Sequence, residues 1–170
     1  MKAGVLFSGG KDSALAALLL SRDYEVELNT FVFSIGDETR AVENAARATG
    51  LPWKRRLFEE GFLERVVEMV IMCGYPNEAI QQVHRRAIEM LCHDYPVVAD
   101  GTRMDDRIPM LSRDEAQSFQ DRTGCSYIRP LLGYGRKEVD RLARRHFRIA
   151  NGQTGQIANG DYERGIRSGI

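Results

Sequence analysis

Hydrophobic positions along the chain fall into short runs that alternate with longer stretches of helical spacing. Residues 2–7 are apolar almost throughout and are followed by Ser-Gly-Gly, which is typical of a strand buried on both faces. Residues 11–22 are rich in Ala and Leu, which predicts a helix that packs against more than one neighbour. The chain therefore begins with a strand, a glycine turn and a helix.

The same alternation continues as far as His146. Apolar runs predict further strands at residues 25–34, 52–58, 97–99 and 127–132. Periodic apolar positions predict further helices at residues 37–49 with Asp37 as the cap, 59–73, 78–94 with Asn77 as the cap, 112–123 with a capping box of Ser112 and Glu115, and 136–146. Alternating strands and helices form βαβ units, so we expect an α/β fold of three layers, α/β/α, around a mainly parallel five-stranded sheet.

The pattern changes near the end of the chain. Residues 150–170 are rich in Gly, Asn and Gln. We therefore expect residues 1–149 to form one domain and residues 150–170 to form a glycine-rich tail. Three arrangements of this tail remain open: it closes over a bound ligand, it docks on a second subunit in a homodimer, or it is a loosely ordered terminus.

Composition narrows the cellular setting. The 24 basic residues balance 24 acidic ones, so no global basic field for nucleic acid exists, although a local patch is compatible with this balance. No apolar run approaches the ~20 residues that span a membrane, and the N-terminal residues lack a signal-peptide pattern. Three widely spaced cysteines without a CxxC pair predict no disulfide framework. We expect a soluble protein of the reducing cytoplasm.

The individual cysteines favour structural interpretations. Cys73 and Cys92 lie in apolar helical stretches and are expected to be small core residues. Cys125 follows a glycine near a strand and is the best candidate for a reactive thiol, although the structural interpretation is favoured there as well. The three histidines have no metal-ligand spacing with any cysteine.

Polar segments follow three of the predicted strands. Residues 8–10 follow the first strand, residues 34–36 the second and residues 100–107 the fourth. Parallel strands place their carboxyl ends at one edge of the sheet, which is where ligands of such folds bind. We therefore expect the three segments to lie close together.

The first of these segments has the composition of an anion site. Gly9 and Gly10 let the backbone turn sharply and approach a ligand. The helix that follows directs unpaired N–H groups and the positive end of its dipole at the turn. With Ser8, Lys11 and Ser13 around it, the natural anion is a phosphate, so we expect nucleotide chemistry. Neither a Walker A sequence nor a GxGxxG sequence is present.

The sequence Ser8-Gly9-Gly10-x-Asp12-Ser13 resembles the PP-loop of the ATP pyrophosphatases, the adenine nucleotide alpha-hydrolase-like superfamily with its HUP/Rossmann-like fold. Enzymes of that superfamily cleave ATP between the α- and β-phosphates and leave AMP on an acceptor oxygen. The resemblance implies that Asp12 helps to hold Mg²⁺ and that the adenine lies near the backbone of Phe33 and Ser34. The implied β- and γ-phosphate ligands are the hydroxyls of Ser8 and Ser13 and the amides of Gly9, Gly10 and Lys11.

The side chain of Lys11 occupies a variable position of the motif. Two interpretations stay open for it: the ammonium group adds positive charge at the phosphates, or it points to solvent.

A second motif supports the resemblance. Residues 101–106, Gly-Thr-Arg-Met-Asp-Asp, resemble the Gly/Ala-His-x-x-Asp-Asp element of the tRNA-lysidine synthetases and the tRNA thiolation enzymes, with Thr102 in place of His as in the Gly-Thr of GMP and NAD synthetases. The resemblance implies that Asp105 and Asp106 are catalytic, with Asp106 as a metal ligand, and that Arg103 or Arg107 meets phosphate. Nucleotide contacts are implied for Gly101, Thr102 and Arg103. The alternative is a solvated, self-paired surface loop.

The resemblance spans residues 1–147, without the CxxC pairs of thiolation enzymes, and is greatest to the small stand-alone members of the superfamily. It implies an enzyme that uses ATP and Mg²⁺ to adenylate an unidentified acceptor, a tRNA base or a small metabolite, and releases pyrophosphate. The alternative is a non-catalytic adenine-nucleotide-binding module, similar in fold to universal stress proteins. The basic stretch from Arg136 to Arg148 is either a solvated helix face or a surface for an RNA backbone such as that of tRNA.

Overall fold

The computed structural model describes residues 1–147. The predicted tail and Arg148 lie outside the described residues. The strands are β1 (Lys2–Leu6), β2 (Glu25–Val32), β3 (Trp53–Leu57), β4 (Val97–Ala99) and β5 (Ser126–Ile128). The helices are α1 (Lys11–Leu20), α2 (Arg40–Thr49), α3 (Phe62–Cys73), α4 (Asn77–Asp94), α5 (Arg113–Thr123) and α6 (Arg136–His146).

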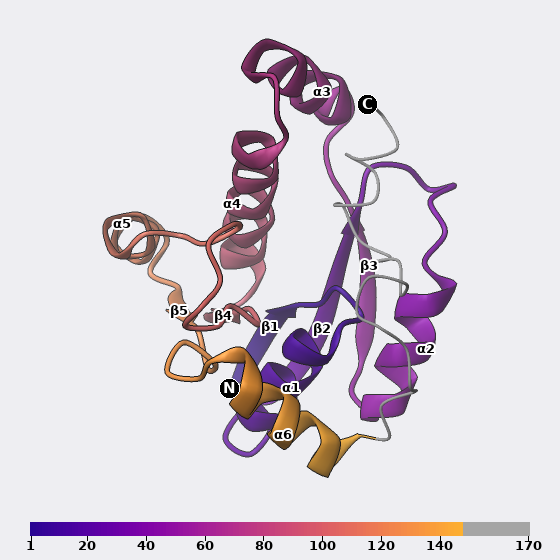
Figure 1. Ribbon diagram of the computed structural model, residues 1–170, viewed down its shortest axis with the longest axis vertical. Helices are drawn as coiled ribbons and strands as arrows, with labels where there is room; N and C mark the ends of the chain where they lie inside the picture. Colours follow the sequence, from indigo (N-terminus) through magenta and orange to yellow (C-terminus); the bar gives the residue numbers. More distant parts are fainter. Residues whose placement is uncertain (148–170) are drawn as a thin grey trace.

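The five strands form one parallel sheet in the order β3-β2-β1-β4-β5 (Figure 1). One face packs against α3, α4 and α5, and the other packs against α1 and α2. The predicted three-layer α/β/α fold with a five-stranded parallel sheet is therefore confirmed. The strand order reverses between β1 and β4, and the carboxyl ends at such a reversal frame the ligand crevice of doubly wound folds.

Helix α1 packs on two sides, as predicted from its apolar residues, which lie almost all round the helix. Ala14 and Ala17 face the sheet, whereas Leu15 packs with Leu131 and Val139 beneath α6. All three of these larger side chains are fully buried. Burial on both sides holds the N-terminal turn of α1 in place, because the helix cannot shift without exposing one of the two apolar contacts.

Local predictions differ from the structure at a few boundaries. Strand β5 ends at Ile128, because the chain turns where the Leu132 N–H bonds the Arg129 carbonyl at 3.2 Å. Pro130 within this stretch also lacks the N–H that a longer ladder requires. Helix α4 begins at Asn77 itself, after Pro76, with no side-chain cap. The capping box of Ser112 and Glu115 is confirmed at α5.

Asp37 does not cap α2. Its Oδ2 accepts hydrogen bonds from the backbone N–H groups of Phe33, at 2.9 Å, and Ser34, at 3.0 Å. Helix α2 begins later, at Arg40, after Thr39. The carboxylate therefore closes the turn after β2 and satisfies the two backbone donors at the end of that strand.

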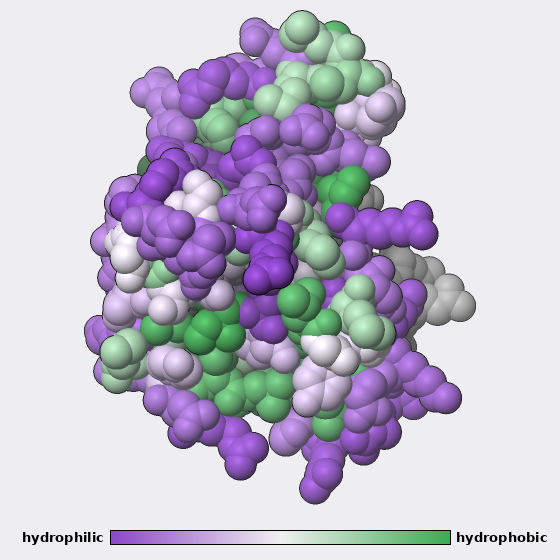
Figure 2. All heavy atoms as spheres, turned by 90° about the vertical axis from the view of Figure 1, so that its left-hand side faces the viewer, coloured by the Kyte–Doolittle hydropathy of each residue, from purple (hydrophilic) through white to green (hydrophobic). Residues whose placement is uncertain are grey.

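The outer end of α3 carries exposed apolar side chains. Ile71 and Met72 are 72% and 87% exposed, and weakly hydrophobic residues appear at the upper end of the molecule in Figure 2. Cys73 is exposed as well, so its predicted place in the core is wrong, whereas Cys92 is buried as predicted. Among residues 1–147, no helix has both the length and the apolar character needed to cross a membrane.

Candidate functional site

The loops that follow β1 and β4 meet at the point where the strand order reverses. A Cβ atom on Gly101 would lie 2.6 Å from the backbone nitrogen of Ser13 and 2.8 Å from the carbonyl carbon of Asp12. Only a residue without a side chain allows this approach. The structure therefore brings residues 8–13 and 101–106 together, as the parallel topology predicts.

The turn after β1 has the backbone geometry of an anion-binding corner. Gly9 has a φ of +81°, and a Cβ atom there would lie 3.2 Å from the backbone of Val42. Gly10 precedes α1 in an extended conformation and forms no side-chain cap with that helix. The positive end of the α1 dipole is consequently directed at the glycine turn.

Two serine hydroxyls hold the shape of this turn. The Oγ atoms of Ser8 and Ser13 lie 3.3 Å apart, and the Ser13 hydroxyl donates to the Gly10 carbonyl at 3.1 Å. The backbone N–H of Ser8 donates to Ser13 Oγ at 3.3 Å. These hydrogen bonds are long, so an oxyanion that offers stronger acceptors can replace them.

Arg103 is the centre of the charged groups at this corner. Its Nη2 atom lies 2.6 Å from Asp106, and its Nε atom lies 3.5 Å from both Asp12 and Asp105. Lys11 Nζ lies 3.7 Å from Asp12 and 3.4 Å from Asp140 of α6. Four carboxylates therefore share two cationic side chains, so a polyphosphate that entered without a cation would meet a net negative corner.

Asp12 has a carboxylate oxygen, Oδ1, whose ion-pair partner Lys11 Nζ lies 3.7 Å away, beyond hydrogen-bond distance. This Oδ1 atom is buried without a hydrogen bond within residues 1–147. Burial raises the pKa of this carboxyl above its ordinary value, and that effect exceeds the attraction of Lys11 and Arg103. A buried carboxylate oxygen without a donor fits a hard cation such as Mg²⁺. No group of three metal-ligating side chains converges within the described residues, so phosphate and water oxygens would have to supply the remaining ligands.

Asp105 and Asp106 have different partners. Asp106 accepts a hydrogen bond from the Arg103 backbone at 2.8 Å as well as from its guanidinium group, so this part of the loop is self-paired. Asp105 accepts a hydrogen bond from the backbone N–H of Arg136 at 3.0 Å, which lowers the pKa of Asp105. Asp105 therefore ties the loop to the start of α6.

The backbone at the end of β2 is already occupied. The N–H groups of Phe33 and Ser34, which the resemblance places near adenine, both donate to Asp37. The Phe33 ring packs against Phe58, with the ring centroids 5.1 Å apart. An adenine at this edge would consequently use carbonyl acceptors or displace Asp37.

A buried network behind the second loop was not predicted. Asp100 Oδ2 lies 2.9 Å from His84 Nε2 of α4 and accepts a hydrogen bond of 2.5 Å from the Tyr127 hydroxyl. Its Oδ1 accepts a hydrogen bond from the backbone N–H of Thr102 at 2.9 Å. Burial alone would raise the pKa of Asp100, but these hydrogen bonds outweigh it and hold that pKa below its ordinary value. The network fixes the backbone on both sides of Gly101.

The remaining predicted residues form none of the ion pairs of the corner within residues 1–147. Arg107 is exposed and has no hydrogen bond or ion pair within residues 1–147; it lines a separate cavity. Burial raises the pKa of Cys92 to about 12 and also raises the pKa of Cys125, so neither thiol has nucleophilic character.

Residues 1–170 match the sequence model of DUF7411, a family of unknown function. The chain belongs to this family. An uncharacterized protein of Methanocaldococcus jannaschii is 39% identical over 168 residues, which cover 98% of this chain and 84% of that protein.

Solved structures share the fold. A protein from Methanocaldococcus jannaschii described as a predicted subunit of tRNA methyltransferase is 40% identical, with a TM-score of 0.81 over 85% of this chain and 76% of that one. NH3-dependent NAD synthetase from Campylobacter jejuni is 17% identical, with a TM-score of 0.50 over 85% of this chain and 63% of that one. NMN synthetase from Francisella tularensis is 12% identical, with a TM-score of 0.55 over 85% and 60%. At such low identity the two synthetases show the fold alone.

Proposed function

We propose that this member of DUF7411 is a PP-loop ATP pyrophosphatase that binds ATP with Mg²⁺ and adenylates an acceptor. The observation that carries the proposal is the buried oxygen of Asp12, which forms no hydrogen bond within residues 1–147 and lies beside a glycine turn at the N-terminus of α1. A turn of this kind fits phosphate oxygens, and the carboxylate fits the cation that accompanies them. The fold shared with two synthetases is compatible with this activity.

The residues of the corner have separate roles in the proposed reaction. The hydroxyls of Ser8 and Ser13 and the amides of the turn hold the β- and γ-phosphates. An acceptor oxygen attacks the α-phosphorus, the bond to the bridging oxygen breaks, and pyrophosphate leaves with the electron pair. Lys11 and Arg103 stabilise the charge that develops on the leaving group. Asp12 and Asp106 would hold Mg²⁺, which would supply Lewis-acid stabilisation at the phosphates.

RNA is the acceptor class that we favour. Helix α6 carries exposed cationic side chains that form no hydrogen bond or ion pair within residues 1–147. They include Lys137, Arg144 and Arg145. The similar structure from Methanocaldococcus jannaschii is described as a predicted subunit of tRNA methyltransferase. A basic helix face of this kind suits a phosphate backbone, so we include tRNA and a partner subunit in the proposal.

A second candidate rests on Arg103. Its guanidinium group forms ion pairs with Asp106 and Asp12, the two carboxylates that we propose as metal ligands. If this pairing persists when nucleotide binds, the protein is a non-catalytic adenine-nucleotide-binding module. The two candidates differ in turnover, so one assay separates them.

The assay measures the products formed from ATP labelled at the γ-phosphate, with Mg²⁺ and a tRNA and metabolite pool. We expect labelled pyrophosphate, and we expect Asp12→Asn to reduce its release by at least about 100-fold because the cation loses its protein ligand. Asp121→Asn is the matched control, since this exposed carboxylate on α5 accepts a hydrogen bond from Gln117 and has no role in the corner. Release of orthophosphate without pyrophosphate would refute the proposal. Tight ATP binding without turnover would favour the binding module.

Removal of Arg103 is expected to change metal binding and nucleotide binding in opposite directions. In Arg103→Met, Asp12 and Asp106 lose the cation that they share, so Mg²⁺ without nucleotide should bind about fivefold more tightly, which corresponds to ~1 kcal/mol for a partly exposed pair. ATP should bind more weakly, because a phosphate ligand is lost. Calorimetry measures both affinities. Arg141→Met, which removes a guanidinium group paired with Glu138 on α6, should change neither.

A further inference from the structure

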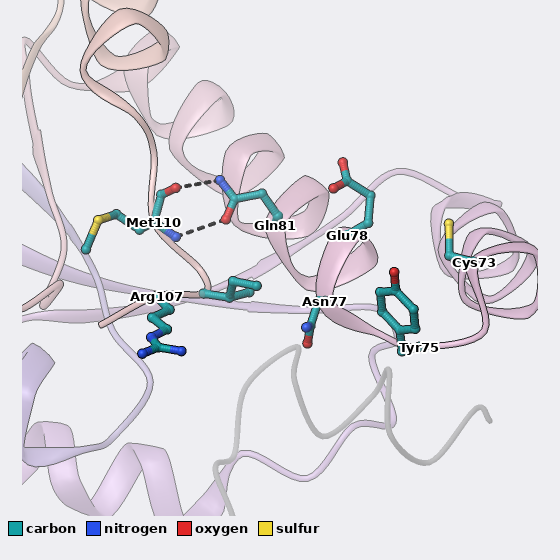
Figure 3. A pocket seen from close by; sticks show the side chains of 8 residues that line it. Cys73, Tyr75, Asn77, Glu78, Gln81, Arg107 and Met110 are labelled. Atoms are coloured by element: carbon teal, nitrogen blue, oxygen red, sulfur yellow. Dashed lines mark hydrogen bonds between the residues drawn. The ribbon is translucent and has the colours of Figure 1, made fainter. Parts of the chain in front are cut away.

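An open cavity of about 520 Å³ is lined in part by Arg107, which follows Asp106 of the charged corner, and has no role in the reaction described above. Its walls come from the turn between α3 and α4, from the first turns of α4 and from the chain that follows Asp106 (Figure 3). The residues that line it are Cys73, Tyr75, Asn77, Glu78, Gln81, Arg107, Ile108 and Met110.

The wall beyond Arg107 is fixed against α4 without any ligand. Gln81 donates from Nε2 to the Met110 carbonyl at 2.7 Å and accepts from the Met110 N–H at 2.9 Å. This paired hydrogen bond makes the cavity a preformed feature. Because α4 leads back to the start of β4, its first turn lies toward the carboxyl edge of the sheet, the same edge as the glycine turn.

Three side chains present unused recognition groups. The residue Tyr75 is 63% exposed. Arg107 and the Asn77 amide form no hydrogen bond or ion pair within the described part of the chain. Figure 3 shows Arg107 and Tyr75 on opposite sides of the cavity, with Asn77 between them. A ligand that spans the cavity therefore meets an aromatic face at one end, an amide in the middle and a guanidinium group at the other end.

We propose that this cavity binds a nucleoside monophosphate unit, with the base stacked on Tyr75 and the phosphate on Arg107. An exposed tyrosine offers a stacking surface to any base, and a free guanidinium group binds phosphate in a bidentate manner. Asn77 and the carboxylate of Glu78 can pair with the edge of a base that carries an amino group. The unit is either a free nucleotide or one residue of a single-stranded RNA, and the inference builds on the proposed function by naming a subsite for its acceptor.

Arg107 also connects the cavity with the corner. It directly follows Asp106, which is paired with Arg103. A phosphate on Arg107 would therefore lie at the corner side of the cavity, and the adjoining nucleotide of an RNA would be directed toward the proposed ATP site. The cavity thus provides the position next to the acceptor.

The test measures binding of fluorescein-labelled hexacytidylate RNA by anisotropy and of CMP by calorimetry, both at low salt. Tyr75→Ala and Arg107→Ala are each expected to weaken binding about tenfold, through loss of stacking and of a charge-assisted hydrogen bond. Tyr75→Phe keeps the ring and should remain within about twofold of the wild type. Arg22→Ala removes the same charge at an exposed position after the C-terminus of α1, outside the cavity, and is therefore the control for charge.

The outcomes separate this inference from the proposed function. If Asp12→Asn abolishes pyrophosphate release but binds RNA normally, the two sites are distinct, as expected. If the protein never cleaves ATP but its RNA or CMP binding depends on Tyr75 and Arg107, the cavity stands and the proposed function falls. If the alanine substitutions weaken the binding of RNA but not of CMP, the ligand is a residue of an RNA. If they weaken the binding of CMP, the ligand is a free nucleotide. Binding that neither alanine variant weakens, or no binding of either probe, would overturn the inference.

Discussion

Asp100→Ala is expected to destabilise the protein by about 3–5 kcal/mol, because it removes the shared acceptor of a buried hydrogen-bond network. Asp100 is 3% exposed and His84 is 4% exposed, so water cannot replace the lost carboxylate. The substitution also leaves the Tyr127 hydroxyl and the Thr102 N–H without their acceptor. Because typical domains are stable by only ~5–15 kcal/mol, this is among the largest effects that a single substitution can have here.

The destabilisation should depend on pH. The pKa of Asp100 is lowered in the folded protein, so its carboxylate contributes stability that is present above the unfolded-state pKa of ~3.9 and is lost as the pH falls through the folded-state pKa. The stability difference between the wild type and Asp100→Asn, which keeps the shape of the side chain, should therefore be greatest near neutral pH and should shrink below a pH of about 4.

Urea unfolding at several pH values measures both effects. Asp121→Ala, which removes an exposed carboxylate from α5, should stay within about 0.5 kcal/mol of the wild type at every pH. If Asp100→Asn lowered the free energy of unfolding by the same amount at every pH, the carboxylate would act through packing alone. If Asp100→Ala were as stable as the wild type, the network would have no structural role.

The fold was predictable because the information for it is local. Apolar runs and helical periods lie within single segments, and the capping box of Ser112 and Glu115 marks the start of α5 within four residues. The proximity of residues 8–13 and 101–106 was predictable for a related reason. Once the strands are parallel, their carboxyl ends must share an edge.

The partners of individual charges were not predictable in this way. Asp100 was interpreted as one residue of a polar loop, but its partners lie 16 and 27 positions away on α4 and β5. No local period links these residues, and only the packing of α4 on the sheet brings them together. Asp37 is a residue type that often caps helices, but its carboxylate accepts hydrogen bonds from two backbone N–H groups at the end of β2 instead. Competition between such partners is decided by tertiary structure.

Gly101→Ala is expected to reduce ATP-dependent activity by about 100-fold, the effect of misplacing catalytic groups by ~1 Å, and to destabilise the fold by about 1–3 kcal/mol through overpacking. The added Cβ would lie 2.6 Å from Ser13 N and 2.8 Å from Asp12 C. Both atoms belong to the backbone of α1, which is buried on two sides, so no flexible side chain can move to make room. Either α1 or the second loop must shift.

The shift would separate the groups that the proposed reaction needs together. Arg103 reaches Asp12 only because the second loop lies against the first turn of α1. Gly133→Ala is the matched control, since no atom of residues 1–147 lies within 4 Å of a Cβ atom there. Thermal unfolding with and without ATP and Mg²⁺ tests the site apart from turnover, because a ligand that binds the folded state raises the Tm. If Gly101→Ala unfolded at the wild-type temperature and gained the same increment from ATP, the close contact between the two loops would not be what assembles this site.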